Sequence, residues 1–234
     1  MKILKMKRIV LFFLALFFFS SASFVNAQFK DELDCLENLS LEKIDFSKDV
    51  AKEKMSYLQD YILCQTAATG NSKGCAYHTD SQRCKDNYVF FVDCYSKLAS
   101  SGKVSQETAN ACMKTVQRSK VDSDQFNLYL QAIAQSNPKI CENIKDSGLK
   151  DRCSAIAARR VSACDADDRD CEQIINYLRA VSENKEDYCK RIDTNNMSKM
   201  CLGSATRSER ICRECRGFAS FKQFYCRKYF GRKK

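Results

Sequence analysis

Two cysteines near the C-terminus, Cys212 and Cys215, are separated by two residues, which is the spacing of a redox-active dithiol. In thiol-disulfide oxidoreductases the pair begins a helix that follows a strand, and the helix N-terminus lowers the thiol pKa. Here no strand is predicted before Cys212, and neither proline nor glycine stands between the cysteines. Arg216, in place of a histidine, excludes covalent haem attachment. We therefore expect Cys212 or Cys215 to pair with Cys226 across a bend, and keep the oxidoreductase as an alternative.

A second group of residues has the composition of a zinc site. Cys75 and His78 are separated by two residues, and Cys64 and Cys84 would complete a set of three thiolates and one imidazole. An oxidising compartment favours disulfides over thiolates, however, and an exposed loop is the simpler place for the only histidine. We expect no metal at this position.

The acidic run at 165–170 resembles a calcium loop only superficially. It lacks the glycine at loop position six, and Asn176 stands where position twelve requires a bidentate glutamate. Carboxylates at the start of a helix also interact favourably with its dipole. A single histidine, inside a cysteine-bounded loop, leaves any nucleophile without a suitable base. The sequence thus predicts neither an enzyme nor a bound cofactor.

The N-terminal 27 residues have the pattern of a secretory signal peptide. A basic start (Lys2 to Arg8) precedes an apolar run of eleven residues (Ile9 to Phe19), and small residues end at Ala27. The run is too short to span a bilayer, and no later stretch approaches about 18 apolar residues. We expect an exported protein, periplasmic or secreted, without a transmembrane helix after cleavage; retention of the segment as an anchor is the alternative.

All fifteen cysteines of the chain follow the signal segment. This density in an exported protein predicts a disulfide framework. Because fifteen is odd, one cysteine is left to stay buried as a thiol or to link two chains as a disulfide-bonded dimer.

The mature chain is expected to be all-α. It has one proline and seven glycines, and apolar residues recur at helical spacing. A shift of 48 residues superimposes 122–164 on 170–212 without a gap and brings three cysteines into register, which indicates a duplicated helical unit. We therefore divide the mature chain into an N-terminal helical region (28–120), a two-copy repeat (121–212) and a basic aromatic tail (213–234).

The spacing of the cysteines predicts helical hairpins closed by disulfides. Residues twelve apart in one helix are about 18 Å apart, too far for a disulfide, so a bond between Cys141 and Cys153 requires the chain to reverse direction near Asp146 to Gly148. Similar pairs flank turns elsewhere. The predicted pairs are Cys64–Cys75, Cys94–Cys112, Cys141–Cys153, Cys164–Cys171 and Cys189–Cys201.

The first copy also resembles a known repeat unit. Its residues 141–153 match C-x-x-I-x-D-x-x-L-[RK]-D-x-C, found in uncharacterised exported cysteine-rich helical repeat proteins of prokaryotes. The second copy departs from the pattern at Asp193, Met197 and Lys199. The resemblance implies the fold and carries no activity.

The C-terminal tail is the expected binding surface. Residues 207–234 hold ten lysines or arginines against two glutamates, and aromatic residues at 218, 221, 225 and 229 would share one helix face. Such a segment could bind an anionic envelope component or a partner protein, or it could lie in a membrane as part of a membrane-active effector. In the alternative, the aromatic residues pack on the preceding helix. Nucleic acid suits this chemistry but is rarely met by an exported protein. The candidate binding residues are Phe218, Phe221, Lys222, Tyr225, Arg227, Lys228, Tyr229, Arg232, Lys233 and Lys234.

Overall fold

The computed structural model describes residues 29–44, 46, 52–116 and 122–231, and these contain helices and no β-strand. They form two compact units. Unit 1 combines 29–44 with 222–231, and unit 2 covers the described residues from Phe46 to Phe221. The predicted signal segment with its predicted cleavage site at Ala27, and also Arg232, Lys233 and Lys234, lie outside the described residues.

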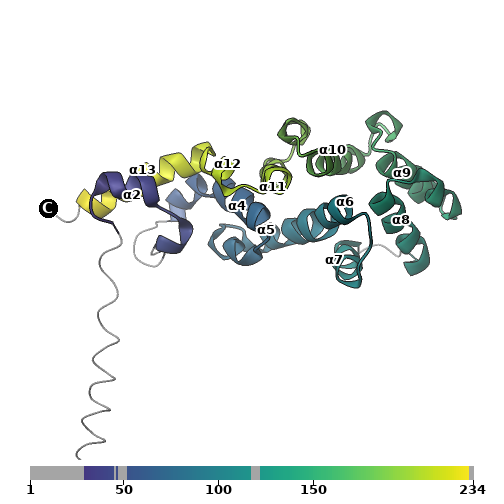
Figure 1. The fold of residues 1–234 in the computed structure, drawn as a ribbon, viewed down its shortest axis with the longest axis horizontal. Helices are drawn as coiled ribbons and strands as arrows, with labels where there is room; N and C mark the ends of the chain where they lie inside the picture. The colour runs from purple at the N-terminus through teal and green to yellow at the C-terminus, as the bar shows by residue number, and fades with distance from the viewer. Residues whose placement is uncertain (1–28, 45, 47–51, 117–121, 232–234) are drawn as a thin grey trace, which may run out of the picture. The chain divides into compact units, whose positions relative to one another are not determined.

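Unit 2 is built from α-helices joined by short 3₁₀ turns, with one π-helix (Figure 1). Its N-terminal part runs through η2 (Lys52–Tyr57), α4 (Gln59–Thr69), η3 (Ser72–Tyr77), α5 (Ser81–Asn87), the π-helix η4 (Tyr88–Ser96), α6 (Lys97–Ser101) and α7 (Gln106–Val116). Its C-terminal part contains α8 (Ser123–Gln135), η5 (Pro138–Asn143), α9 (Ser147–Ala157), η6 (Val161–Ala163), α10 (Arg169–Glu183), η7 (Glu186–Arg191), α11 (Asn195–Thr206) and α12 (Glu209–Arg213).

The C-terminal elements of unit 2 follow the 48-residue shift. The helix α8, the turn η5 and the helix α9 correspond to α10, η7 and α11 in both order and position. The same positions are buried in the two copies, because the apolar residues recur every three or four positions on one helix face. These buried residues are Phe126, Tyr129, Leu130 and Ile133 in α8, and Ile174, Tyr177, Leu178 and Val181 in α10.

The connections after α4, α8, α9, α10 and α11 share one backbone design. In each, a residue in the left-handed region follows the helix, and a cysteine stands five positions later. In four of them the next N–H donates to a carbonyl five residues back, as in a Schellman motif. The 48-residue shift in the sequence did not reveal that the connection after α4 has the same design. The pairs are Gly70/Cys75, Ser136/Cys141, Arg159/Cys164, Asn184/Cys189 and Arg207/Cys212.

In four of these connections the cysteine bonds forward to the next α-helix. The predicted disulfides Cys141–Cys153, Cys164–Cys171 and Cys189–Cys201 are confirmed. The bonded cysteine precedes the helix in a turn, so the disulfide joins a turn to the next helix rather than two facing helices. The predicted Cys94–Cys112 disulfide is also present, and it closes the reversal at Gly102 between α6 and α7.

The predicted Cys64–Cys75 disulfide is wrong. Cys75 lies in a turn and bonds to Cys84 in the next helix, α5. We call this pairing of a turn cysteine with the next helix the forward rule. Cys64 lies on the preceding helix, α4, and bonds instead to Cys212, which is 148 residues away in α12. The spacing predicted a nearby partner for Cys64, but the face of α4 that carries Cys64 is turned toward the end of unit 2.

The helix α4 lies beside α11 and α12, so the start and the end of unit 2 are in contact (Figure 1). The approach of α4 to α11 depends on Gly203. A Cβ atom at this position would lie 2.1 Å from the carbonyl oxygen of Cys64. The corresponding residue of the first copy, 48 positions earlier, is the buried Ala155. The second copy therefore differs from the first where another helix packs on it.

Asn176, in α10, provides a test of this core. Its side chain is buried, and neither its amide nitrogen nor its amide oxygen has a hydrogen-bond partner. The first copy has Leu128 at the same position. A buried polar group without a partner costs about 1–3 kcal/mol. We therefore expect Asn176→Leu to raise the free energy of unfolding by about 1–2 kcal/mol in chemical denaturation. Asn176→Asp should lower it, and a loss of stability in the leucine variant would contradict the prediction.

Unit 1 brings the two ends of the described chain together. It contains α2 (Glu32–Asn38), η1 (Leu41–Lys43) and the second half of α13 (Arg216–Gly231). Asp31 caps α2, where its carboxylate accepts from the N–H of Asp34 at 2.8 Å. Unit 1 buries the side chains of Phe29, Leu39, Leu41, Ile44 and Tyr225, whereas Leu33 of α2 is 71 % exposed.

Candidate functional site

Three of the four residues on the aromatic face of α13 are buried in the protein. Phe218 and Phe221 are each 1 % exposed and Tyr225 is 3 % exposed. In unit 2, the ring of Phe218 stacks on that of Tyr61 in α4, with 3.8 Å between the ring centroids. The assignment of these three aromatics to a binding surface is therefore corrected. An amphipathic helix buries its apolar side whenever the rest of the chain offers an apolar surface, and the sequence could not show that α4 does so.

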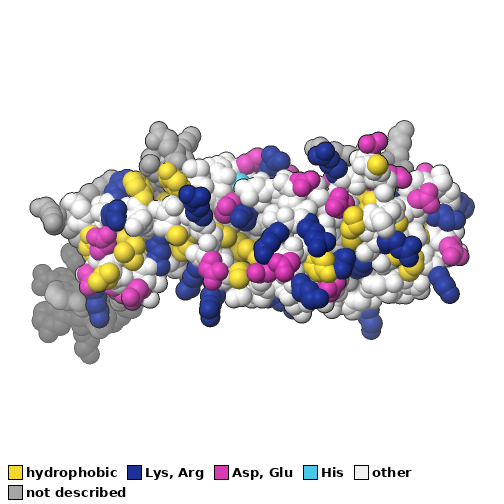
Figure 2. Space-filling model, turned by 90° about the horizontal axis from the view of Figure 1, so that it is seen from above, with side chains coloured by type: hydrophobic (Ala, Val, Ile, Leu, Met, Phe, Trp, Pro, Cys, Tyr) yellow, Lys and Arg dark blue, Asp and Glu magenta, His cyan; other side chains and the backbone are white. Residues whose placement is uncertain are grey.

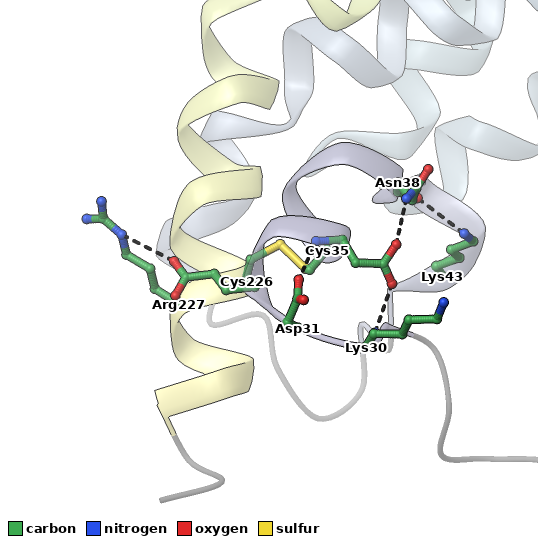
Figure 3. Close-up of a disulfide and its surroundings, with 9 residues drawn as sticks. Lys30, Asp31, Cys35, Asn38, Lys43, Cys226 and Arg227 are labelled. Carbon is green, nitrogen blue, oxygen red and sulfur yellow. Dashed lines mark hydrogen bonds and ion pairs between the residues drawn. A yellow bond between two sulfur atoms is a disulfide. The ribbon is translucent and has the colours of Figure 1, made fainter.

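The predicted partner of Cys226 is also wrong. Cys226 bonds to Cys35 of α2, 191 residues away, and not to Cys212 or Cys215 (Figure 3). This disulfide fixes the C-terminal segment to an N-terminal helix within unit 1. No local spacing signal could have identified Cys35, because its partner is almost a full chain length away.

Some cationic side chains of unit 1 contact other residues of the same unit. Arg227 is an exposed residue, and its Nε lies 3.8 Å from a carboxylate oxygen of Glu32 in α2 (Figure 3). Lys228 lies over the ring of Phe224, with 5.8 Å from Nζ to the ring centroid, and Lys222 is half-buried. Tyr229 is half-buried and stacks on Tyr225. The acidic α2 thus occupies part of the surface that the sequence assigned to an anionic partner.

Four arginines at the end of unit 2 are more accessible. Arg207, Arg210, Arg213 and Arg216 recur at every third position from the end of α11 to the start of α13, and all four are exposed. Within the described part of the chain, none of them lies within ion-pair distance of a carboxylate. Two exposed glutamates are interspersed among them. We call these four residues the arginine row.

The surface shown in Figure 2 has a mixed character. Lysine and arginine side chains are numerous on this face, acidic side chains lie between them, and the hydrophobic side chains are scattered. A face of this kind is suited to polar and electrostatic contacts more than to an apolar interface.

The structure does not bring Cys212 and Cys215 together as a dithiol. Cys212 is bonded to Cys64, and Cys215 is the one cysteine of the fifteen without a disulfide. Cys215 is 6 % exposed, and burial raises the pKa of its thiol, which is opposite to the activation that a redox nucleophile needs. Its burial favours the internal thiol over a disulfide between two chains.

The three cysteines that were considered as zinc ligands form disulfides. Cys75 and Cys84 are bonded to each other, and Cys64 is bonded to Cys212. His78 is buried rather than exposed, its Nδ1 accepts from the N–H of Asp80 at 3.0 Å, and burial lowers the pKa of its imidazole. Across the described ranges, no three His, Cys, Asp or Glu side chains are grouped so as to hold a metal ion.

No protein-family model matches this chain, and neither a curated protein nor a solved structure shows significant similarity to it. None of the helices in the described part of the chain combines the length and the apolar character needed to cross a membrane. Seven disulfides are typical of a protein in an oxidising compartment.

Proposed function

We propose that this protein is an exported, non-catalytic binding module that attaches to an anionic component of the cell envelope through exposed arginines at its C-terminal end. The proposal rests on one observation: α13 buries Phe218, Phe221 and Tyr225, while the arginine row remains exposed and has no ion-pair partner among the described residues. The contact is therefore electrostatic.

The disulfide framework supports this kind of function. A guanidinium group binds phosphate or carboxylate oxygens through paired N–H donors in a fixed plane, so a rigid backbone under the arginines preserves the geometry of the contact. Cys212, within the row, is bonded to α4. The backbone under the arginines does not need to become ordered when a ligand binds. Binding therefore avoids the entropic cost of ordering the chain.

The two alternative functions have less support. A membrane-active helix needs an apolar face to insert, but Phe218, Phe221 and Tyr225 are buried. A thiol-disulfide oxidoreductase needs a reactive dithiol, but Cys212 and Cys215 are not bonded to each other, and Cys215 is buried.

The test is a charge reversal in the arginine row. The triple variant Arg210→Glu/Arg213→Glu/Arg216→Glu should lose binding to phosphatidylglycerol-containing vesicles, measured by co-sedimentation of the mature disulfide-bonded protein. A cation near an anionic surface contributes about 1 kcal/mol, so losing three should weaken binding about 100-fold or more. Binding of the unmodified protein should also weaken as the ionic strength rises.

The control variant changes the net charge equally in another part of unit 2. Lys139, Lys145 and Arg169 are exposed cations distant in sequence from the row, and Lys139→Glu/Lys145→Glu/Arg169→Glu should retain most of the binding. Polyphosphate serves as a second, soluble probe, and separates recognition of a polyanion from recognition of a lipid surface. Equal losses in the two triple variants, or no binding to either probe, would rule the proposal out.

A further inference from the structure

Unit 2 contains a polar cavity of about 500 Å³, which shares only Arg207 with the arginine row. It lies where the C-terminal ends of α4 and α11 meet the π-helix η4. The π-helix contributes Tyr88, Val92, Asp93 and Ser96 to its wall. π-Helical segments are rare and frequently occur at functional sites.

Charged side chains of both signs line this cavity. Lys97 lies between two carboxylates, with its Nζ 2.8 Å from Glu107 and 3.7 Å from Asp93. Arg207, the fourth charged residue, has no carboxylate of the described chain within ion-pair distance. The two cations and two anions cancel formally. The cavity therefore suits a ligand that carries both charges better than one that carries a single charge.

The helix ends favour a positive group on one side of the cavity. The last carbonyl groups of α4 and α11 have no partner within their helices, and the helix dipole makes these ends partly negative. The carbonyl of Gly70, which follows α4, accepts a hydrogen bond from the hydroxyl of Tyr88 at 2.7 Å. Asp93 adds a carboxylate to this wall. A ligand ammonium group would find several acceptors together here.

Asp93 and Tyr88 are partly withdrawn from water. Burial raises the pKa of Asp93 above its usual range despite the nearby Lys97, and burial raises the pKa of Tyr88 to about 12. Tyr88 is therefore an uncharged hydrogen-bonding group at neutral pH. A desolvated carboxylate in a cleft is a common feature of binding sites, because a bound cation restores the stabilisation that water no longer provides.

We propose that this cavity binds a small zwitterion, such as an α-amino acid or a dipeptide. Its ammonium group would contact Asp93 and the carbonyl ends of the helices, and its carboxylate would contact Arg207. A simple anion would meet the carboxylates of Asp93 and Glu107, and a simple cation would meet Lys97 and Arg207. A neutral dipole avoids both conflicts.

Isothermal titration of the disulfide-bonded mature protein tests the proposal, with glycine, L-lysine, L-glutamate and dialanine as probes. We expect at least one of them to bind. Its N-acetylated and carboxyl-amidated analogues, which each lack one charge, should bind about tenfold more weakly or worse, equivalent to about 1.4 kcal/mol. Affinity should fall as the pH falls through the raised pKa of Asp93, because the protonated carboxyl no longer attracts an ammonium group.

Matched variants locate the site. Asp93→Asn and Arg207→Gln should each weaken binding about tenfold. Asp86→Asn and Arg169→Gln change the same residue types at exposed positions outside both the cavity and the arginine row, and should leave binding unchanged. Unfolding curves will show whether each variant is folded. The proposal is overturned if none of the probes binds, if the blocked analogues bind as well as the parent ligands, or if all four variants bind equally.

Discussion

Replacing both Cys64 and Cys212 with alanine should lower the free energy of unfolding by about 5 kcal/mol. This disulfide spans 148 residues and joins α4 to α12. In the chain-entropy treatment, the stabilisation grows with the logarithm of the loop length. Shorter disulfides nested within this loop reduce its effective length but change the logarithm little. Since small proteins are stable by about 5–15 kcal/mol, we expect a large fraction of the stability to be lost.

Equilibrium unfolding in guanidinium chloride without reductant measures this effect. The matched control is Cys164→Ala/Cys171→Ala, which also removes one disulfide but opens a loop of only seven residues. The same treatment gives about 2 kcal/mol for this control. Similar losses in the two double variants would mean that the long disulfide does not restrain the unfolded chain in the way argued here.

The second large effect is expected at Gly203, where an alanine should cost about 3 kcal/mol or more. The added Cβ would lie 2.1 Å from the Cys64 carbonyl oxygen and 2.9 Å from the Ala68 nitrogen. Both are backbone atoms of α4, so no side-chain rotation can relieve the contact, and the two helices must move apart. Overpacking in a dense core typically costs 1–3 kcal/mol, and more where the backbone must shift.

Gly148 provides the control for this substitution. It is also a glycine within a helix of the repeat. A Cβ atom added there would have an Asp146 side-chain oxygen as its nearest neighbour, at 3.6 Å, which is an ordinary contact. Because alanine has the higher helix propensity, Gly148→Ala should stabilise the protein by about 0.5–1 kcal/mol. The two substitutions should therefore have opposite signs in thermal or chemical unfolding. A neutral Gly203→Ala would show that α4 does not approach α11 as closely as described.

Local features of the chain were predictable from the sequence. Turn residues and cysteine spacing identified the pairing of Cys141 with Cys153 and of Cys189 with Cys201, because each involves groups that a short connection must bring together. The forward rule would also have paired Cys75 with Cys84. It depends on a left-handed residue five positions before the cysteine, and Ser136 and Arg159 adopt that conformation without being glycine or asparagine. The residue types alone therefore did not reveal it.

The candidate binding surface was only partly predictable. The concentration of positive charge at the C-terminus is a property of the sequence, and the arginine row is exposed. The sequence also showed that Phe218, Phe221 and Tyr225 share a helix face, but not what covers it. The polar cavity was missed entirely, because Arg207 is far in the sequence from Asp93 and Lys97, and the three residues form no motif.

The sequence by itself determined the helical class, the disulfide-rich chemistry and four of the nearby cysteine pairs. Each of these depends on helical periodicity, composition or a reversal within about twenty residues. Only the tertiary structure decided that Cys64 bonds to Cys212, that Cys35 bonds to Cys226, and that the backbone of α4 packs closely against Gly203. The physical reason is that these features depend on which faces of distant helices meet, and that choice is made by packing over the whole unit.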